Sequence, residues 1–220
     1  MSTSSVLVFL SIVTLACLAM FAAAPELDLI LAGHFFEAGQ FIGRSPAGEW
    51  TRRFFYVAPY ALLAVMLLAF VGRLRGRFRR GPDGRAILFV IASLVLGPGL
   101  LVNGVLKETS HRPRPEQTTE FGGPWRFRPY ETFDGACARN CSFVSGEVAT
   151  SAWTLAPALL APPAFRPFAI GAALLFTAAT ALLRMAFGGH YLSDVLLAAL
   201  LTFLIVLTFY RWYRREAKQQ

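Results

Sequence analysis

The stretch AILFVIASLVLGPGLLVNGVL, residues 86–106, carries no charged side chain. A helix needs about 20 mostly apolar residues to cross the hydrocarbon core of a bilayer, so this stretch alone is long enough to span a membrane. Similar runs occur before and after it, although the last three reach the required length only with flanking polar residues included. The six predicted spans are residues 6–24, 54–72, 86–106, 143–161, 168–184 and 191–210.

The composition agrees with a membrane protein. Of the 220 residues, 55% are hydrophobic and only 15% are charged, whereas a soluble domain carries about 25% charged residues. Only helices and closed barrels satisfy every backbone polar group inside lipid, and these runs are too long and too uniformly apolar for barrel strands. The sequence therefore predicts an all-α fold, a single-domain integral membrane bundle of six transmembrane helices.

The Lys and Arg residues predict how the bundle is oriented. The loop at 73–85 holds six arginines and the tail at 211–220 holds four basic residues, and basic loops face the cytoplasm. Both termini are then cytoplasmic, and the loops at 25–53 and 107–145 are external. This topology accounts for the net charge of +8, so no nucleic-acid partner is expected.

The N-terminal part leaves one alternative open. The first span ends in FAAAPE, residues 21–26, which is similar to a signal-peptide cleavage site, but no Lys or Arg precedes the apolar run. The missing basic region favours a retained helix over a cleaved signal peptide. In the loop that follows, the spacing of the apolar residues predicts a short helix in the membrane interface.

Two of the three cysteines, Cys137 and Cys141, lie in the second external loop. Disulfides form in oxidising compartments outside the cytoplasm, so we expect these two residues to form a local disulfide that clamps the loop. Cys17 falls in the middle of the first span and is expected to be a small buried apolar residue. No metal site is expected, because no second pair of ligands has suitable spacing.

Polar residues gather in three clusters, each at an external membrane boundary. The clusters are KETSHRPRP at 107–115, SFVSGE at 142–147 and RMAFGGHYLSD at 184–194. Lys107, Arg114 and Arg184 stand on the side that basic residues usually avoid, although each alone could be a cation snorkelling at a helix end. Together with backbone N–H groups of Ser145 and Gly146 at a helix start, they predict an anion site, and phosphate is the common anion.

His190 and Asp194 add a reactive group to this site. They are four residues apart, so a helix would place both on one face. A carboxylate can hold an imidazole in one tautomer and leave the other nitrogen free as nucleophile or base. A purely structural hydrogen bond between the two side chains is the simpler alternative. Gly188 and Gly189 allow a tight turn immediately before the histidine.

The first and third clusters resemble signatures of the type 2 phosphatidic acid phosphatase family, which also includes bacterial lipid phosphatases and vanadium haloperoxidases. Lys107, six residues, then Arg114 is similar to the first signature. Arg184, five residues, His190, three residues, then Asp194 is similar to the third. The order of the motifs and the six spans also fit, so the resemblance covers nearly the whole chain.

The resemblance implies a role for each of these residues. The phosphate would be bound by Lys107, Arg114, Ser145, Gly146 and Arg184. His190 would attack phosphorus and become a phosphohistidine, with Asp194 orienting it, and water would then release phosphate. The resemblance implies no metal and no cofactor.

The second cluster departs from the family pattern. Ser145 and Gly146 match the middle of a signature that usually reads Pro-Ser-Gly-His, but Val144 replaces the proline and Glu147 replaces the histidine. That histidine protonates the leaving oxygen, so Glu147 could be a substitute general acid with a raised pKa. It could instead be a structural acid in a first helical turn, with His111 as the acid or with none needed. A third alternative is a site that binds phosphate without turnover.

The expected function is metal-independent dephosphorylation of a lipid-linked phosphate or diphosphate at the external leaflet. The expected partners are the lipid bilayer and a membrane lipid substrate. The expected location is the bacterial inner membrane, with the active site on its external, periplasmic side. Two alternatives are a phosphotransferase that uses the same phosphohistidine and a catalytically silent protein that binds or transports lipid phosphates.

Overall fold

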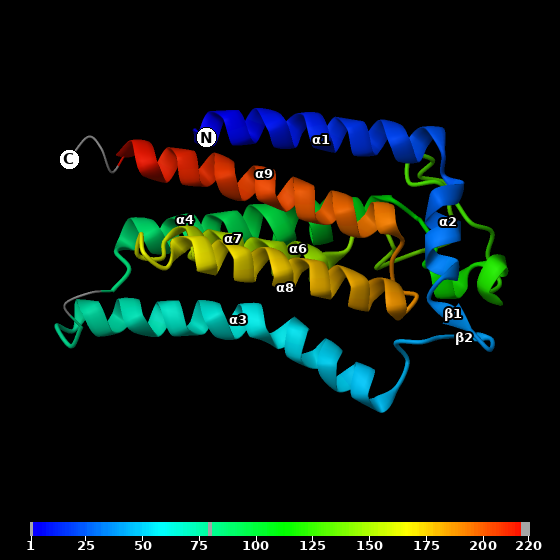
Figure 1. The fold of residues 1–220 in the computed structure, drawn as a ribbon, viewed down its shortest axis with the longest axis horizontal. Helices are drawn as coiled ribbons and strands as arrows, with labels where there is room; N and C mark the ends of the chain where they lie inside the picture. The colour runs from blue at the N-terminus through cyan, green and yellow to red at the C-terminus, as the bar shows by residue number, and fades with distance from the viewer. Residues whose placement is uncertain (1, 79–80, 217–220) are drawn as a thin grey trace.

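The computed structural model describes residues 2–78 and 81–216, and its long helices lie side by side along one axis (Figure 1). Five helices of this described part are long and apolar enough to cross a membrane. They comprise α1 (Thr3–Ala23), α3 (Pro46–Leu74), α4 (Gly84–Leu94) with the π-helix η1 (Val95–Leu106), α8 (Arg166–Ala186) and α9 (Leu192–Glu216). The predicted all-α membrane bundle is confirmed.

The segment predicted to be the fourth span forms two short helices, α6 (Gly146–Trp153) and α7 (Leu155–Leu159). Pro157 has no N–H to donate to the carbonyl of Trp153, which explains why the helix is interrupted at Thr154. Both helices contact α8 and α9, and Trp153 is fully buried. At about 1.5 Å of rise per residue, α6 and α7 are each too short to cross a bilayer, so the count of six spans stays a prediction.

The two ends of the bundle differ in what they carry. The start of α1 and the end of α9 lie at one end (Figure 1), as an even number of crossings requires. The other end carries the irregular loops with α2 (Glu26–Gly33), the hairpin β1 (Phe36–Glu37) and β2 (Gln40–Phe41), α5 (Lys107–Thr109), and the 3₁₀ turns η2 (Pro115–Gln117) and η3 (Thr119–Phe121). Three of the charges used to predict the cytoplasmic side, Arg79, Arg80 and Lys218, lie outside the described residues.

Apolar side chains cover the outside of the bundle as well as its core. Val8, Phe9, Leu68 and Phe168 are exposed, whereas water-soluble monomers rarely expose large contiguous apolar surfaces. The core includes Phe89, which packs beside Trp153 in a cluster at the level of α7. This outward apolar surface fits contact with lipid.

Local sequence explains two features that shape the site. Ser45 caps the N-terminus of α3 by accepting a hydrogen bond from Gly48 N, so α3 begins eight residues before the predicted span at 54 and carries Arg52 within it. In η1, Pro98 cannot donate to a carbonyl in the preceding turn. The side-chain amide of Asn103 donates to the Pro98 carbonyl at 2.6 Å, and this wide helical turn places Asn103 beside α6.

Candidate active site

One cavity of about 370 Å³ collects residues from all three polar clusters. Six of the residues expected to bind or act on phosphate line it: Lys107, Arg114, Gly146, Glu147, Arg184 and His190. They come from α5, the residue immediately before η2, α6, α8 and the loop between α8 and α9. Segments more than 80 residues apart in sequence therefore converge on one polar chamber near the end of the bundle that carries α2 and the β1–β2 hairpin (Figure 1).

His190 is held in one tautomer by the backbone. Its Nδ1 lies 2.7 Å from the carbonyl oxygen of Ser142, and because a carbonyl only accepts, Nδ1 carries the proton. Nε2 is then the nitrogen with the free lone pair. Burial lowers the pKa of His190 to about 4, so the imidazole is neutral near pH 7. Gly188, with φ of +65°, makes the turn that the sequence predicts before this histidine.

Asp194 is fully buried behind His190 and does not touch it at hydrogen-bond distance. Its Oδ2 lies 3.7 Å from His190 Nδ1, which is too long for a hydrogen bond. The same oxygen accepts hydrogen bonds from the Ser142 hydroxyl at 2.5 Å and the Tyr191 N–H at 2.9 Å. Asp194 therefore does not orient His190 through a direct hydrogen bond, as the spacing predicted. It instead contacts Ser142, whose carbonyl binds the imidazole, and Tyr191, which follows the histidine in the chain.

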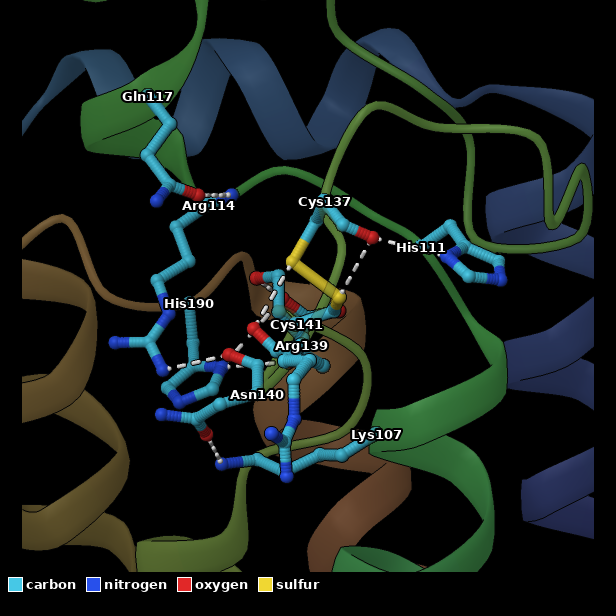
Figure 2. The surroundings of a disulfide bond; sticks show 11 residues. Lys107, His111, Arg114, Gln117, Cys137, Arg139, Asn140, Cys141 and His190 are labelled. Atoms are coloured by element: carbon cyan, nitrogen blue, oxygen red, sulfur yellow. Dashed lines mark hydrogen bonds and ion pairs between the residues drawn. A yellow bond between two sulfur atoms is a disulfide. The ribbon is translucent and has the colours of Figure 1, made fainter.

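The loop closed by the disulfide Cys137–Cys141 positions two of the cations. Within it, Asn140 accepts a hydrogen bond from Lys107 Nζ at 2.8 Å through its side-chain oxygen. Its backbone carbonyl accepts from Arg114 Nη2 at 2.9 Å. Figure 2 shows Asn140 beside His190, with Lys107 and Arg114 reaching it from different sides. The predicted disulfide is therefore present, and it fixes a residue that the sequence did not single out.

Arg184 enters the cavity from α8, and its side chain is only 5% exposed. Its Nε is buried without a hydrogen-bond partner in the described part of the chain. A Cβ on Gly189 would lie 2.4 Å from Arg184 Nη2, so only glycine lets this backbone approach the guanidinium. A buried donor without a partner costs free energy. An anionic ligand that accepted a hydrogen bond from Arg184 Nε would remove this cost.

The start of α6 contributes one residue to the cavity and uses another as a cap. Ser145 is the N-cap, and its hydroxyl oxygen lies 3.4 Å from Val148 N as acceptor; Ser145 does not line the cavity. Gly146 does line it, and a Cβ there would lie 2.5 Å from Asn103 Oδ1. The expected role of the Ser145 hydroxyl in phosphate binding stays a prediction.

Glu147 is held by two arginines. Its Oε1 accepts from Arg52 Nη2 at 2.9 Å and Nε at 3.2 Å. Arg184 Nε lies 3.6 Å from Oε2. Two adjacent guanidinium groups favour the charged form of a carboxylate, which is the opposite of what a general acid requires.

His111, the other candidate acid, lies outside the cavity. Its Nδ1 is 2.9 Å from the Cys137 carbonyl oxygen, and Figure 2 places its ring on the opposite side of the disulfide from His190. Arg52, Asn103 and Asn140 line the cavity but were not identified from the sequence. Only Arg52 had a signal, since it is a basic residue in a loop predicted to be external.

Two further cavities adjoin the polar chamber. An apolar cavity of about 470 Å³ lies between α3 and η1 and shares Tyr60, Asn103 and Thr150 with the chamber. A second cavity of about 450 Å³ shares the arginines at 52, 114 and 184 and extends toward the start of α3. The described residues include no group of three or more His, Cys, Asp or Glu that could hold a metal ion.

Residues 84–218 match the PAP2 superfamily model. Three curated relatives are each named lipid A 4'-phosphatase. The protein from Rhizobium leguminosarum is 36% identical over 199 residues, which are 83% of this chain and 85% of the relative. Those from Rhizobium etli and Francisella tularensis subsp. novicida are 34% and 33% identical, over 83% and 89% of this chain and 77% and 90% of the relatives.

No solved structure matches the chain. The family model covers more than half of the sequence and includes all three polar clusters. By this match and by its curated relatives, the chain belongs to the PAP2 superfamily, the type 2 phosphatidic acid phosphatase family that its first and third motifs indicate.

Proposed function

We propose that this PAP2-family phosphatase removes a phosphate group from a phosphorylated glycolipid of the lipid A class at the external leaflet, through a phosphohistidine intermediate. The observation that carries the proposal is the polar chamber, in which a neutral His190 shares one cavity with Lys107, Arg114 and Arg184. Positioned cations stabilise the charge that develops on a transferring phosphoryl group.

The adjoining apolar cavity supports a lipid as the substrate. It is lined mainly by apolar residues of η1 and meets the chamber at Tyr60, Asn103 and Thr150. A phosphate in the chamber could therefore continue into acyl chains that lie against α3 and η1. The name shared by the three relatives supports a lipid A phosphate within this class.

The proposed chemistry has two steps. His190 Nε2 forms a bond to phosphorus while the bond between phosphorus and the ester oxygen breaks, and the leaving oxygen takes a proton from water, which leaves hydroxide. A second water then attacks phosphorus and the N–P bond breaks. Inorganic phosphate leaves, and the proton released by this water neutralises the hydroxide formed in the first step. Lys107, Arg114 and Arg184 bind the phosphoryl oxygens in both steps.

We propose that Glu147 is an electrostatic anchor and not the general acid. Its contacts with Arg52 and Arg184 hold two guanidinium groups at the edge of the phosphate position. The negative charge of the carboxylate also reduces the repulsion between the two positively charged guanidinium groups. Under this proposal, Glu147 has a different role from the family histidine at the same motif position, which protonates the leaving oxygen.

The test is phosphate release by the purified full-length protein from lipid A, glycerophospholipid and polyprenyl phosphates, with His190→Ala beside it. Removing a nucleophile typically costs several orders of magnitude, so we expect release to fall by at least about 1,000-fold. His34→Ala is the matched control, because His34 has the same kind of Nδ1 contact with a carbonyl, that of Ile30, but lies outside the chamber.

Alkaline quenching with a radiolabelled substrate tests the intermediate. We expect label on the wild-type and His34→Ala proteins and none on His190→Ala. Release that survives in His190→Ala would contradict the phosphohistidine. Release from other lipids but not from lipid A would contradict the substrate class alone, and transfer of the label to an added alcohol would favour a phosphotransferase.

A further inference from the structure

A buried ionic cluster lies behind the active site, and Asp194 is its only member to which the motifs assign a role. Arg112 and Asp28 are each 1% exposed and Asp194 is 0% exposed. Arg112 Nη1 donates to Asp194 Oδ1 at 2.6 Å, and Nη2 donates to Asp28 Oδ2 at 2.7 Å. None of the three lines the polar chamber, so this arginine is not one of the phosphate-binding cations.

The cluster is tightly arranged around the guanidinium of Arg112. Its Nε donates to the carbonyl of Arg128 at 2.9 Å, and its Cζ lies 4.3 Å from the ring centroid of Tyr191. Asp28 in turn accepts hydrogen bonds from the backbone N–H and hydroxyl of Ser193. One cation thus joins α2, the loop before α6 and the start of α9.

Ser142 connects this cluster to the reactive histidine. Its hydroxyl donates to Asp194 Oδ2 at 2.5 Å, and its N–H donates to the Arg112 carbonyl at 2.9 Å. Its own carbonyl accepts the proton of His190 Nδ1 at 2.7 Å. The acceptor that fixes the tautomer of His190 is therefore held at two points, and both lead to Arg112.

We infer that Asp28 and Arg112 are positioning residues that keep His190 in its Nδ1–H tautomer through Asp194 and Ser142. A buried ion pair adds little net stability compared with apolar packing, so stability alone gives no reason to bury three charges here. The need to fix a tautomer does give a reason to bury these charges, because only the Nδ1–H form of His190 leaves Nε2 free to act. The catalytic consequence rests on the proposed function, whereas the tautomer itself does not.

Nitrogen NMR of the full-length protein with isotope-labelled histidine tests this inference directly. The chain has only three histidines, and Nδ1 of each lies at hydrogen-bond distance from a backbone carbonyl. His34 and His111 therefore serve as internal references. In Asp28→Asn and Ser142→Ala we expect the His190 signals to shift toward a mixture of tautomers, while those of His111 stay unchanged.

Kinetics of the same variants separate positioning from binding. Residues that orient metal-binding histidines typically cost 10- to 100-fold when they are changed, and we expect a fall of about that size in kcat here. We expect the inhibition constant for inorganic phosphate to stay within about twofold, because the phosphate-binding cations are untouched. Asp134→Asn, which removes an exposed acid paired with Arg128, is the matched control and should change neither quantity.

The outcomes distinguish this inference from the proposed function. A His190 signal that keeps the Nδ1–H pattern in both folded variants would overturn the inference, even if activity falls. A shifted tautomer in a protein whose wild type dephosphorylates no lipid would leave the inference standing and remove the proposed function. Arg112→Lys adds a third variant, in which one ammonium group cannot reproduce the fork of contacts.

Discussion

Glu147 accepts two hydrogen bonds from Arg52 and lies beside Arg184. Glu147→Gln keeps an oxygen for Arg52 but removes the charge. If the residue is an anchor, we expect kcat to fall by less than about 10-fold, whereas loss of a general acid costs about 100- to 10,000-fold. The measurement is kcat for two phosphate esters whose leaving alcohols differ in acidity.

An anchor slows both esters equally, because it does not protonate the leaving oxygen. A much larger loss for the less acidic alcohol would show that Glu147 is the acid after all. The control is Glu49→Gln, since Glu49 also pairs with Arg52, at 3.6 Å, but is half-exposed. We expect this control to retain wild-type kinetics.

The protonation of His190 gives a prediction about pH. Burial lowers the pKa of His190 from its usual 6.5 to about 4. Protonation would occupy the Nε2 lone pair, so activity should be lost only as the pH falls through about 4, and not through 6.5. The measurement is kcat/KM between pH 3.5 and 8, roughly the range that brackets both pKa values, after correction for substrate ionisation followed by phosphorus NMR. An acid limb near 6.5 that belongs to the enzyme would contradict this environment for His190.

At the scale of elements, the loop Cys137–Cys141 holds Asn140, which in turn orients Lys107 and Arg114. Without the disulfide, these two hydrogen bonds lose their fixed acceptor. One hydrogen bond contributes about 1 kcal/mol, so loss of both, about 2 kcal/mol, should make the double variant Cys137→Ser, Cys141→Ser bind vanadate about 30-fold more weakly. Reduction of the wild-type protein should have the same effect.

The inhibition constant for vanadate is measured with and without reductant. Cys17→Ser is the matched control, because Cys17 is a free cysteine in α1 and lies outside the chamber. Wild-type affinity in the double variant would mean that Asn140 keeps its position without the covalent loop.

Hydrophobic patterning predicted the long helices well because a lipid-facing helix needs little beyond length and apolar character. It did not predict that α3 begins at Pro46, since Arg52 and Arg53 were interpreted as loop residues. A charge marks the membrane boundary and need not mark the end of a helix. The interruption between α6 and α7 at Thr154 did have a local signal in Pro157, but a search for long apolar runs does not register a single proline.

The same limit applies to the site. Spacing within motifs predicted the six residues that share the chamber, because a family pattern records which residues converge. Arg52, Asn140 and Asp28 come from segments with no motif of their own, and Arg112 is one of the six unspecified residues between Lys107 and Arg114 in the first motif. Their partners lie between 33 and 95 residues away in sequence, so only the fold identifies them.

For the whole molecule, the start of α1 and the end of α9 lie at one end (Figure 1), which predicts an even number of crossings. Single cysteines placed in a Cys17→Ser background at Ser2 and Arg77 should react only with membrane-permeant reagents in intact cells. Asp134 is half-exposed and belongs to the loop before α6, which the sequence predicts to be external. A cysteine there should react with impermeant reagents, although an added thiol must be checked for exchange with the native disulfide. Labelling of all three positions from one side would contradict the predicted topology.

The last prediction concerns the junction of the polar chamber with the apolar cavity. Gly104 lines the apolar cavity, and a Cβ there would meet only ordinary contacts at 3.6 Å. Gly104→Leu therefore places the rest of a leucine side chain in the space assigned to acyl chains. We expect KM for a long-chain lipid phosphate to rise by about 10-fold, which corresponds to about 1.4 kcal/mol of lost binding.

A short, water-soluble phosphate ester reports on the chamber alone, so its kcat/KM should stay within about twofold of the wild-type value if the variant acts only on acyl-chain binding. Gly171→Leu is the matched control. It makes the same change on α8, where a Cβ would meet nothing within 4 Å, and Gly171 lies outside the apolar cavity. An equal loss with both substrates would mean that Gly104→Leu deforms η1 and the chamber with it. No loss with either would mean that the acyl chains lie elsewhere, because a filled cavity cannot also bind them.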